Sequence, residues 1–256
     1  MSSLPNFLPS RFEEIPDCYL RLPRTGSVKG VLVAIHGISR NAAEIALRFS
    51  QSGAWDGWDI MAPLFEKKRF GQYQQMIAKG RQTASDKALL MLLDRLELDH
   101  ALELEIISLF GFSGGAQMAH RFAMLHPQRV RKVVAAAAGW YMLPDANLPY
   151  PVGWSGIGVG RNSELALGLS VPMMICVGSD DRGRDKALRR SPVIDQRLGT
   201  NRHNRARRWV GEVRTAAEKL SVASNIEFAV IPDGTHDFGV CVELGNLIPD
   251  AADYLN

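Results

Sequence analysis

Short apolar runs alternate along most of the chain with longer segments of helical periodicity. Several of these runs are continuous and lack the polar–apolar alternation of a strand that has one face in water. A strand buried on both faces, as in a parallel sheet covered by helices, produces this pattern. The runs that predict strands are Cys18–Leu22, Val31–Ile35, Asp59–Ala62, Glu105–Phe110, Lys132–Ala137, Met173–Val177 and Ile226–Ile231.

The segments between the apolar runs predict helices, and the order of elements predicts the fold class. The predicted helices are Ala42–Gln51, Thr83–Leu98, Gly114–Leu125, Arg205–Leu220 and Val240–Leu255, the last with a break or kink at Pro249. A length of 256 residues fits one α/β domain over residues 1–256. We therefore expect an open, mostly parallel twisted sheet with helices on both faces.

One stretch, from Gly139 to Ser170, interrupts this alternation with aromatic, proline and glycine residues. It is too broken for a long helix. It follows a predicted strand and therefore starts at the carboxyl edge of the sheet, where open α/β sheets bind ligands. Residues 139–170 are either a short lid-like insertion that walls a pocket or a long loop packed on its own aromatic side chains.

Composition narrows the class of protein. Hydrophobic residues make up 46% of the chain and the net charge is +3, so attraction of the whole molecule to nucleic acid is not indicated. No run of about 20 apolar residues could cross a membrane. The N-terminus lacks the pattern of a signal peptide, which makes a cytoplasmic location the expectation. The three cysteines are widely spaced and predict neither a disulfide framework nor a zinc site.

Basic residues concentrate between Arg182 and Arg214, where the sequence has ten arginines and one lysine but only three acidic residues. One interpretation is a solvated helix face. The other is a basic rim that attracts anionic substrates, because guanidinium groups match carboxylates and phosphates. The sequence leaves both open, and the oligomeric state also stays open.

The sequence Gly111-Phe112-Ser113-Gly114-Gly115 carries the clearest chemical signal. An apolar strand-like run leads into it and a helix-like run follows. A glycine-flanked serine on a sharp strand–turn–helix forms a nucleophile elbow, which exposes the hydroxyl for attack on a carbonyl. Ser113 is therefore the candidate nucleophile.

A serine nucleophile needs a base, and the base needs an orienting carboxylate. His236 lies after the last predicted strand, as expected for the chain order Ser, Asp, His. The strand before it ends in Gly178-Ser179-Asp180-Asp181, so two neighbouring acids compete for the third position. By spacing we favour Asp181, with Asp180 as second choice.

An oxyanion formed during attack needs backbone N–H donors. We expect one donor at Gly114, directly after the nucleophile, and a second at Ile38, in the loop that follows the strand ending at Ile35. In that loop Arg40 either anchors the backbone or reaches the substrate. His36 is interpreted as a structural hydrogen-bonding residue.

Taken together, His36-Gly37, Gly111 to Gly115, Gly178 to Asp181 and Gly234-Thr235-His236 resemble the α/β-hydrolase superfamily over nearly the whole chain. Within it, the chain is similar to small single-domain esterases of the dienelactone-hydrolase, carboxylesterase and polyhydroxybutyrate-depolymerase-like groups. It departs from dienelactone hydrolase in having a serine where that enzyme has a cysteine nucleophile. The resemblance implies the α/β-hydrolase fold and acyl-ester chemistry without a metal or organic cofactor, and it supports Asp181 as the acid.

These residues predict a serine hydrolase that cleaves carboxylic esters of a small or medium substrate through an acyl-enzyme. The predicted substrate contacts are Phe112, Trp140, Tyr141 and Arg40. The same groups could serve an acyltransferase, a thioesterase or a peptidase, because a fold does not fix the reaction. A hypothesis of another class is a non-catalytic ligand-binding protein on a hydrolase scaffold.

Overall fold

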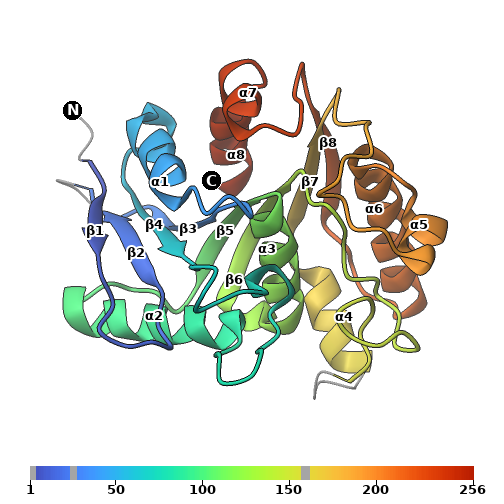
Figure 1. Cartoon of the computed structure of the whole chain (residues 1–256), viewed down its shortest axis with the longest axis horizontal. Coiled ribbons are helices and arrows are strands. Elements are labelled where there is room, and N and C mark those ends of the chain that lie inside the picture. The colour runs from blue at the N-terminus through green and yellow to red at the C-terminus, as the bar shows by residue number, and fades with distance from the viewer. Residues whose placement is uncertain (1–3, 24–27, 157–161) are drawn as a thin grey trace.

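The computed structural model describes residues 4–23, 28–156 and 162–256 of the chain. Within them, eight strands form one sheet in the order β1-β2-β4-β3-β5-β6-β7-β8, seen at the centre of Figure 1. The strands are β1 (Asn6–Leu8), β2 (Asp17–Arg21), β3 (Gly30–Ile35), β4 (Trp58–Leu64), β5 (Ile107–Phe112), β6 (Val130–Ala136), β7 (Met173–Gly178) and β8 (Ile226–Ile231).

The sheet is mostly parallel, as the sequence predicts. Each neighbouring pair from β4 to β8 is parallel, whereas β1 and β2 pair in antiparallel directions at one edge. The sequence pattern did not predict β1, which has three residues and is mostly exposed, so it lacks a buried apolar signature.

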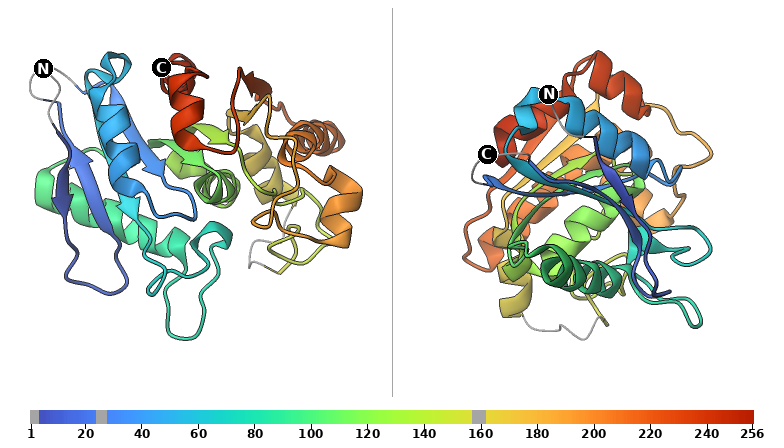
Figure 2. Two further views of the ribbon diagram at one scale, coloured as in Figure 1. Left: turned by 45° about the horizontal axis from the view of Figure 1, so that its top comes forward. Right: turned by 90° about the vertical axis from the view of Figure 1, so that its left-hand side faces the viewer.

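Helices cover both faces of the twisted sheet, as the right-hand view of Figure 2 shows. Helices α1, α7 and α8 pack on one face, and α2, α3 and α6 pack on the other. The helices are α1 (Ala42–Gln51), α2 (Ser85–His100), α3 (Gly114–Leu125), α4 (Asn162–Ser170), α5 (Pro192–Leu198), α6 (Arg202–Lys219), α7 (Phe238–Glu243) and α8 (Leu247–Leu255), with short 3₁₀ helices at Gly53–Trp55, Tyr73–Gln75 and Pro127–Arg129.

The helix layers on the two faces of the sheet explain why the strands are continuous apolar runs. In β3, Val33 and Ile35 enter the core shared with α2 and α3, whereas Leu32 and Ala34 enter the core shared with α1 and α8. Successive side chains of a strand point to opposite faces, so a strand between two apolar cores must be apolar at every position.

Two helical predictions need correction. The predicted helix over 240–255 breaks at Leu244–Asn246, before Pro249, where Asn246 adopts a left-handed backbone conformation with φ of 55°. Pro249 is the third residue of α8 and lies in its first turn. N–H groups in the first turn have no carbonyl partner within the helix, so proline is tolerated there. Helices α4 and α5 were not predicted, and α4 forms the end of the 139–170 segment.

The chain reverses its direction of travel across the sheet between β3 and β5. From β3 it runs outward to β4 and then returns to place β5 on the other side of β3. The loops after β3 and β5 therefore leave the same sheet edge in different directions, which opens a crevice between them. Residues 36–41 and Ser113 lie in or directly beside this crevice.

Helix α3 packs unusually close to the sheet because two glycines lack a side chain. A Cβ atom at Gly115 would lie 2.0 Å from the carbonyl oxygen of Ile35, and one at Gly111 would lie 2.3 Å from the carbonyl oxygen of Gly115. Backbone atoms block both positions, so any larger residue must push the helix and strand apart.

His36 joins the ends of β3 and β4. Its Nε2 accepts the N–H of Phe65 at 3.0 Å, and its Nδ1 lies 2.8 Å from the carbonyl oxygen of Gly37, to which it donates. The ring is fully buried, and burial lowers the pKa of His36 from its ordinary 6.5 to about 4. The histidine is therefore neutral and holds the first residues of the loop after β3.

The close packing of α3 predicts that Gly115→Ala destabilises the fold. Because the added methyl group would overlap a backbone carbonyl, we expect the free energy of unfolding in urea to fall by at least about 3 kcal/mol. Gly211→Ala in α6 is the matched control, since nothing lies within 4 Å of its Cβ position. That change should raise stability by up to about 1 kcal/mol, through a better helix propensity. Equal stability of the Gly115 variant and wild type would contradict the packing argument.

The buried neutral His36 predicts a loss of stability in acid. Below pH 6.5 the unfolded chain binds a proton at this residue, whereas the folded chain does not until about pH 4. The contribution of His36 is therefore complete above pH 6.5 and is lost as the pH falls towards 4, by about 3 kcal/mol. We expect the stability difference between wild type and His36→Gln to shrink by about this amount between pH 7 and pH 4. A difference independent of pH would refute the role of burial.

Candidate active site

Ser113 occupies the sharp turn between β5 and α3. Its φ of 54° and ψ of −108° are unusual for a residue with a side chain. Its N–H donates to the carbonyl oxygen of Ala136 in β6 at 2.8 Å, and a Cβ atom at Gly37, in the loop after β3, would lie 3.6 Å from its own Cβ atom. The neighbouring strand and loop thus hold the strained turn in place and leave the hydroxyl facing the crevice.

His236 approaches Ser113 from the loop that follows β8. Its Nε2 lies 3.1 Å from Oγ of Ser113. The imidazole stacks on the ring of Phe112, with 5.8 Å between the ring centroids, and its side chain remains 24% exposed. Phe112 therefore holds one face of the imidazole in place, while part of the side chain stays accessible to solvent.

Asp181 is the third member of this series of contacting side chains, after Ser113 and His236. Its Oδ2 lies 2.9 Å from Nδ1 of His236, and its carboxylate is almost fully buried. A carboxylate can only accept here, so Nδ1 carries the hydrogen and Nε2 is free to accept the hydroxyl proton of Ser113. Asp180 instead points into solvent, where its Oδ1 accepts a hydrogen bond from the hydroxyl of Ser179 at 3.2 Å.

Two glycines bring the loops after β7 and β8 together. A Cβ atom at Gly178 would lie 2.1 Å from the carbonyl oxygen of Gly234, and the N–H of Asp180 donates to that same oxygen at 2.9 Å. This contact sets Asp181 opposite His236. It explains why the second acid of the pair, and not the first, reaches the imidazole.

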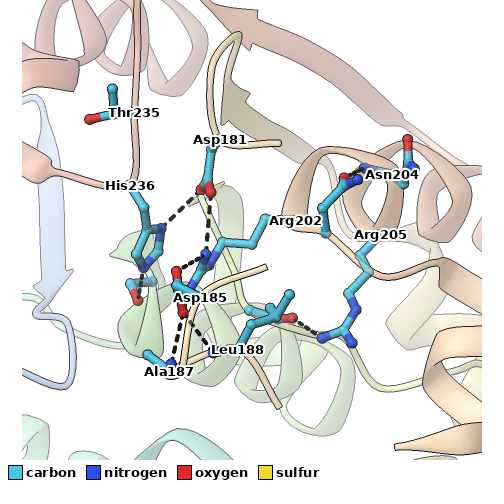
Figure 3. A network of polar contacts seen from close by, with 12 residues as sticks. Asp181, Asp185, Ala187, Leu188, Arg202, Asn204, Arg205, Thr235 and His236 are labelled. Carbon is cyan, nitrogen blue, oxygen red and sulfur yellow. Dashed lines mark hydrogen bonds and ion pairs between the residues drawn. The ribbon is translucent and has the colours of Figure 1, made fainter. Parts of the chain in front are cut away.

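Arg202, at the start of α6, is a buried partner of Asp181. Its Nη1 lies 3.2 Å from Oδ1 of Asp181 and 2.6 Å from Oδ2 of Asp185 (Figure 3). Asp185 also accepts the N–H groups of Ala187 and Leu188, and its bond from Arg202 lowers the pKa of its carboxyl group. Arg202 therefore connects the buried acid to the turn at 185–188, a link between distant segments that the local sequence pattern did not reveal.

Arg205, one turn further along α6, is also buried and anchors three segments. Its guanidinium donates to the carbonyl oxygens of Gly139, Arg189 and Gly199 and to the carboxylate of Asp195. Other arginines of the basic segment are paired as well, Arg184 with Asp195 and Arg197 with Glu212. Arg202 and Arg205 thus form a structural network inside the protein, whereas most other arginines of the basic segment are exposed.

The two predicted oxyanion donors lie next to each other. The backbone nitrogen of Ile38 is 3.3 Å from the point where a Cβ atom at Gly114 would be. In the described part of the chain, neither N–H has a hydrogen-bond partner. Tyr73, which sequence reasoning missed, supports this loop by donating its hydroxyl to the carbonyl oxygen of His36 at 2.7 Å. Arg40 stacks on the ring of Tyr73, 4.5 Å from its centroid, and so anchors the loop.

A cleft of about 210 Å³ opens beside Ser113. Of the four predicted substrate contacts, Trp140 lines it, together with Gln117 and Arg189, which were not predicted. Phe112 lies beneath His236 instead, and Tyr141 is fully buried against Trp209. These two aromatic side chains support the site from the core, because neither has a surface that a substrate can reach.

The predicted segment 139–170 begins as a fixed wall of this cleft. The carbonyl oxygen of Gly139 accepts from Arg205 at 2.6 Å, and that of Met142 accepts from the indole of Trp209 at 2.6 Å. Residues 157–161 of the segment lie outside the described residues.

Two kinds of feature are absent from the described residues. None of their helices combines the length and apolar character needed to traverse a bilayer. No cluster of three or more His, Cys, Asp or Glu side chains among them has the arrangement of a metal site. The three cysteines are buried and unpaired.

Comparisons with known proteins identify the fold. No protein-family model matches the sequence, and no curated protein matches it significantly. Poly(aspartic acid) hydrolase-1 from Sphingomonas sp. KT-1 superimposes with a TM-score of 0.82 at 21% identity, over 95% of this chain and 97% of that chain. A poly(3-hydroxybutyrate) depolymerase from Bordetella parapertussis gives a TM-score of 0.79 at 24% identity, over 98% and 87% of the two chains. A fluorophosphonate-binding serine hydrolase from Staphylococcus aureus gives 0.60 at 12% identity, over 99% of each.

These likenesses extend over nearly the whole chain, and at such low identity they concern the fold. The strand order and the turn at Ser113 agree with them and with the resemblance seen in the sequence. This chain has the α/β-hydrolase fold.

Proposed function

We propose that this protein is a serine hydrolase that cleaves carboxylic esters of a small or medium substrate through an acyl-enzyme. The observation that carries the proposal is the continuous chain from Ser113 Oγ to His236 at 3.1 Å and from His236 to Asp181 at 2.9 Å. Its serine end lies beside the backbone N–H groups of Ile38 and Gly114, which have no hydrogen-bond partner among the described residues. Acyl transfer needs this arrangement.

In the proposed reaction, Ser113 Oγ attacks the ester carbonyl carbon while Nε2 of His236 takes the hydroxyl proton. Asp181 accepts the Nδ1–H throughout and stabilises the imidazolium. The negative charge that develops on the carbonyl oxygen is held by the N–H groups of Ile38 and Gly114. His236 then gives its proton to the leaving alcohol, which departs and leaves an ester on Ser113.

Water completes the cycle in the same site. His236 removes a proton from the water molecule as it attacks the acyl carbon, and it returns that proton to Oγ as the acid is released. The partial exposure of the His236 side chain, 24%, favours water as the acceptor over a reaction that must exclude it. This favours hydrolysis over acyl transfer.

The structural neighbours support this class of reaction. Those compared above are named as a poly(aspartic acid) hydrolase, a poly(3-hydroxybutyrate) depolymerase and a fluorophosphonate-binding serine hydrolase. A ferulic acid esterase also has a similar fold, with a TM-score of 0.58 at 16% identity. The cleft of about 210 Å³ suits a small or medium acyl group.

Removal of the nucleophile should abolish turnover. We expect Ser113→Ala to lower kcat for p-nitrophenyl ester hydrolysis by at least about 10³-fold, because no acyl-enzyme can form. The circular dichroism spectrum and unfolding midpoint should stay close to those of wild type. Turnover by the variant at the wild-type rate would rule out Ser113 as the nucleophile.

The two neighbouring acids provide a matched pair of variants. Asp181→Asn should lower kcat/KM by about 10³-fold or more, since an amide can donate to Nδ1 and favour the wrong tautomer of His236. The variant should still fold, because Arg202 keeps Asp185 as its partner. Asp180→Asn, at an exposed position, should leave kcat/KM within about twofold of wild type. The reverse ranking would assign the acid to Asp180.

A further inference from the structure

We propose that the cleft beside Ser113 binds a carboxylate group carried by the ester substrate, with Arg189 as its principal partner. The inference rests on the proposed function and narrows its substrate to esters that carry a negative charge. Three features of the cleft support it: an excess of positive charge, an arginine with free N–H groups in the same cleft as the nucleophile, and unused hydrogen-bonding capacity.

Two guanidinium groups lie against the indole of Trp140. The Cζ atom of Arg121 is 4.3 Å from the ring centroid and that of Arg189 is 4.5 Å from it. An aromatic face attracts a cation but carries no net charge that could neutralise it. The arrangement therefore concentrates positive charge at the wall of the cleft.

Within the described residues, neither arginine forms an ion pair. Arg121 is fully buried and donates to the carbonyl oxygens of Gln117 at 2.8 Å and Gln74 at 3.3 Å. Burial, followed by repulsion from Arg189, lowers the pKa of Arg121 to about 10. Buried charges are normally paired, so an anion in the cleft would relieve both effects.

The nearby acids offset this charge only in part. Asp181 and Asp185 both pair with Arg202, as described above, and this group of three carries one net negative charge. Arg121 and Arg189 carry two positive charges, so the wall of the cleft keeps an excess of positive charge.

Arg189 is held in position by its backbone while its guanidinium remains exposed. Its carbonyl oxygen accepts from the buried Arg205 at 2.8 Å, which fixes this part of the cleft wall. Its guanidinium lies over the Trp140 ring, and its N–H groups form no hydrogen bond within the described residues, which leaves them for a planar carboxylate. Since Ser113 and Arg189 line the same cleft, one substrate can reach both.

Gln117 adds hydrogen-bonding capacity between them. It lies one helical turn after Ser113, and its N–H donates to the carbonyl oxygen of Ser113 at 3.2 Å. The residue is 8% exposed, and its Oε1 is buried without a hydrogen-bond partner. A buried polar group without a partner is costly. A carboxylate only accepts hydrogen bonds, so it would pair with this side chain through the amide N–H groups. The amide can turn to present either its oxygen or its N–H groups.

The test compares two esters whose acyl groups have equal length and differ in charge, p-nitrophenyl hemiglutarate and p-nitrophenyl pentanoate. Wild type should prefer the hemiglutarate in kcat/KM, and the preference should weaken as sodium chloride is added. Arg189→Gln should reduce the ratio of the two kcat/KM values by about tenfold or more, because a charge-assisted hydrogen bond is lost. Arg189→Lys should keep part of the preference, since it retains the charge.

Arg190→Gln is the matched control. It removes the same charge from the adjacent residue, which is also exposed but does not line the cleft, and it should leave the ratio unchanged. Turnover of both esters with the same ratio in wild type and Arg189→Gln would overturn the carboxylate subsite and leave the proposed function standing. An equal loss of the ratio in both arginine variants would mean that only the general surface charge matters, and it would also overturn the subsite.

A binding measurement separates the two proposals. Glutarate titrated calorimetrically into wild type should bind at least about tenfold more tightly than into Arg189→Gln. If wild type hydrolyses neither ester but binds glutarate through Arg189, the proposed function fails and the subsite stands. Equal affinity, or no binding by wild type, would contradict the subsite whatever the esters show.

Discussion

The candidate site depends on how closely helix α3 lies against strands β3 and β5. Gly111 and Gly115 allow backbone atoms to meet where any side chain would collide. The chain must then turn within one residue, which forces Ser113 to a φ of 54° and points its hydroxyl into the crevice at the reversal of strand order. The same turn puts the N–H of Gly114 at the positive end of a helix, next to Ile38. One packing constraint thus positions the nucleophile and one oxyanion donor together.

Two arginines of the basic segment act from inside the protein, although most of the others are exposed. A cluster of arginines in sequence suggests a solvated or ligand-binding face, yet Arg202 and Arg205 are among the most buried side chains. Arg202 connects Asp181 to the turn at Asp185 (Figure 3). Arg205 fixes the backbone of Arg189 and Gly139. A buried ion pair adds little net stability, because desolvation offsets attraction, but it fixes geometry. These arginines therefore hold the cleft walls and the buried acid in one arrangement.

Sequence reasoning predicted features that arise from neighbouring residues and missed those that need distant ones. The sheet, the elbow at Ser113 and the approach of His236 follow from local patterns of strand, glycine and helix. Spacing favoured Asp181 and kept Asp180 as second choice, because the orientation of the two acids depends on the contact between Gly178 and Gly234 from two loops. Tyr73, Gln117, Arg189 and the role of Arg202 were missed for the same reason. Phe112 and Tyr141 were expected to touch substrate, since hydrophobicity does not distinguish a pocket wall from the core behind it.

The most direct measurement of the central claim is covalent labelling of Ser113, which requires no knowledge of the substrate. Wild type and Ser113→Ala are incubated with a fluorophosphonate and compared by intact mass, followed by mapping of the modified peptide. An activated serine predicts one adduct on wild type, located at Ser113, and none on the variant. Absence of an adduct on folded wild type, or an adduct at another residue that persists in Ser113→Ala, would contradict the assignment of the nucleophile.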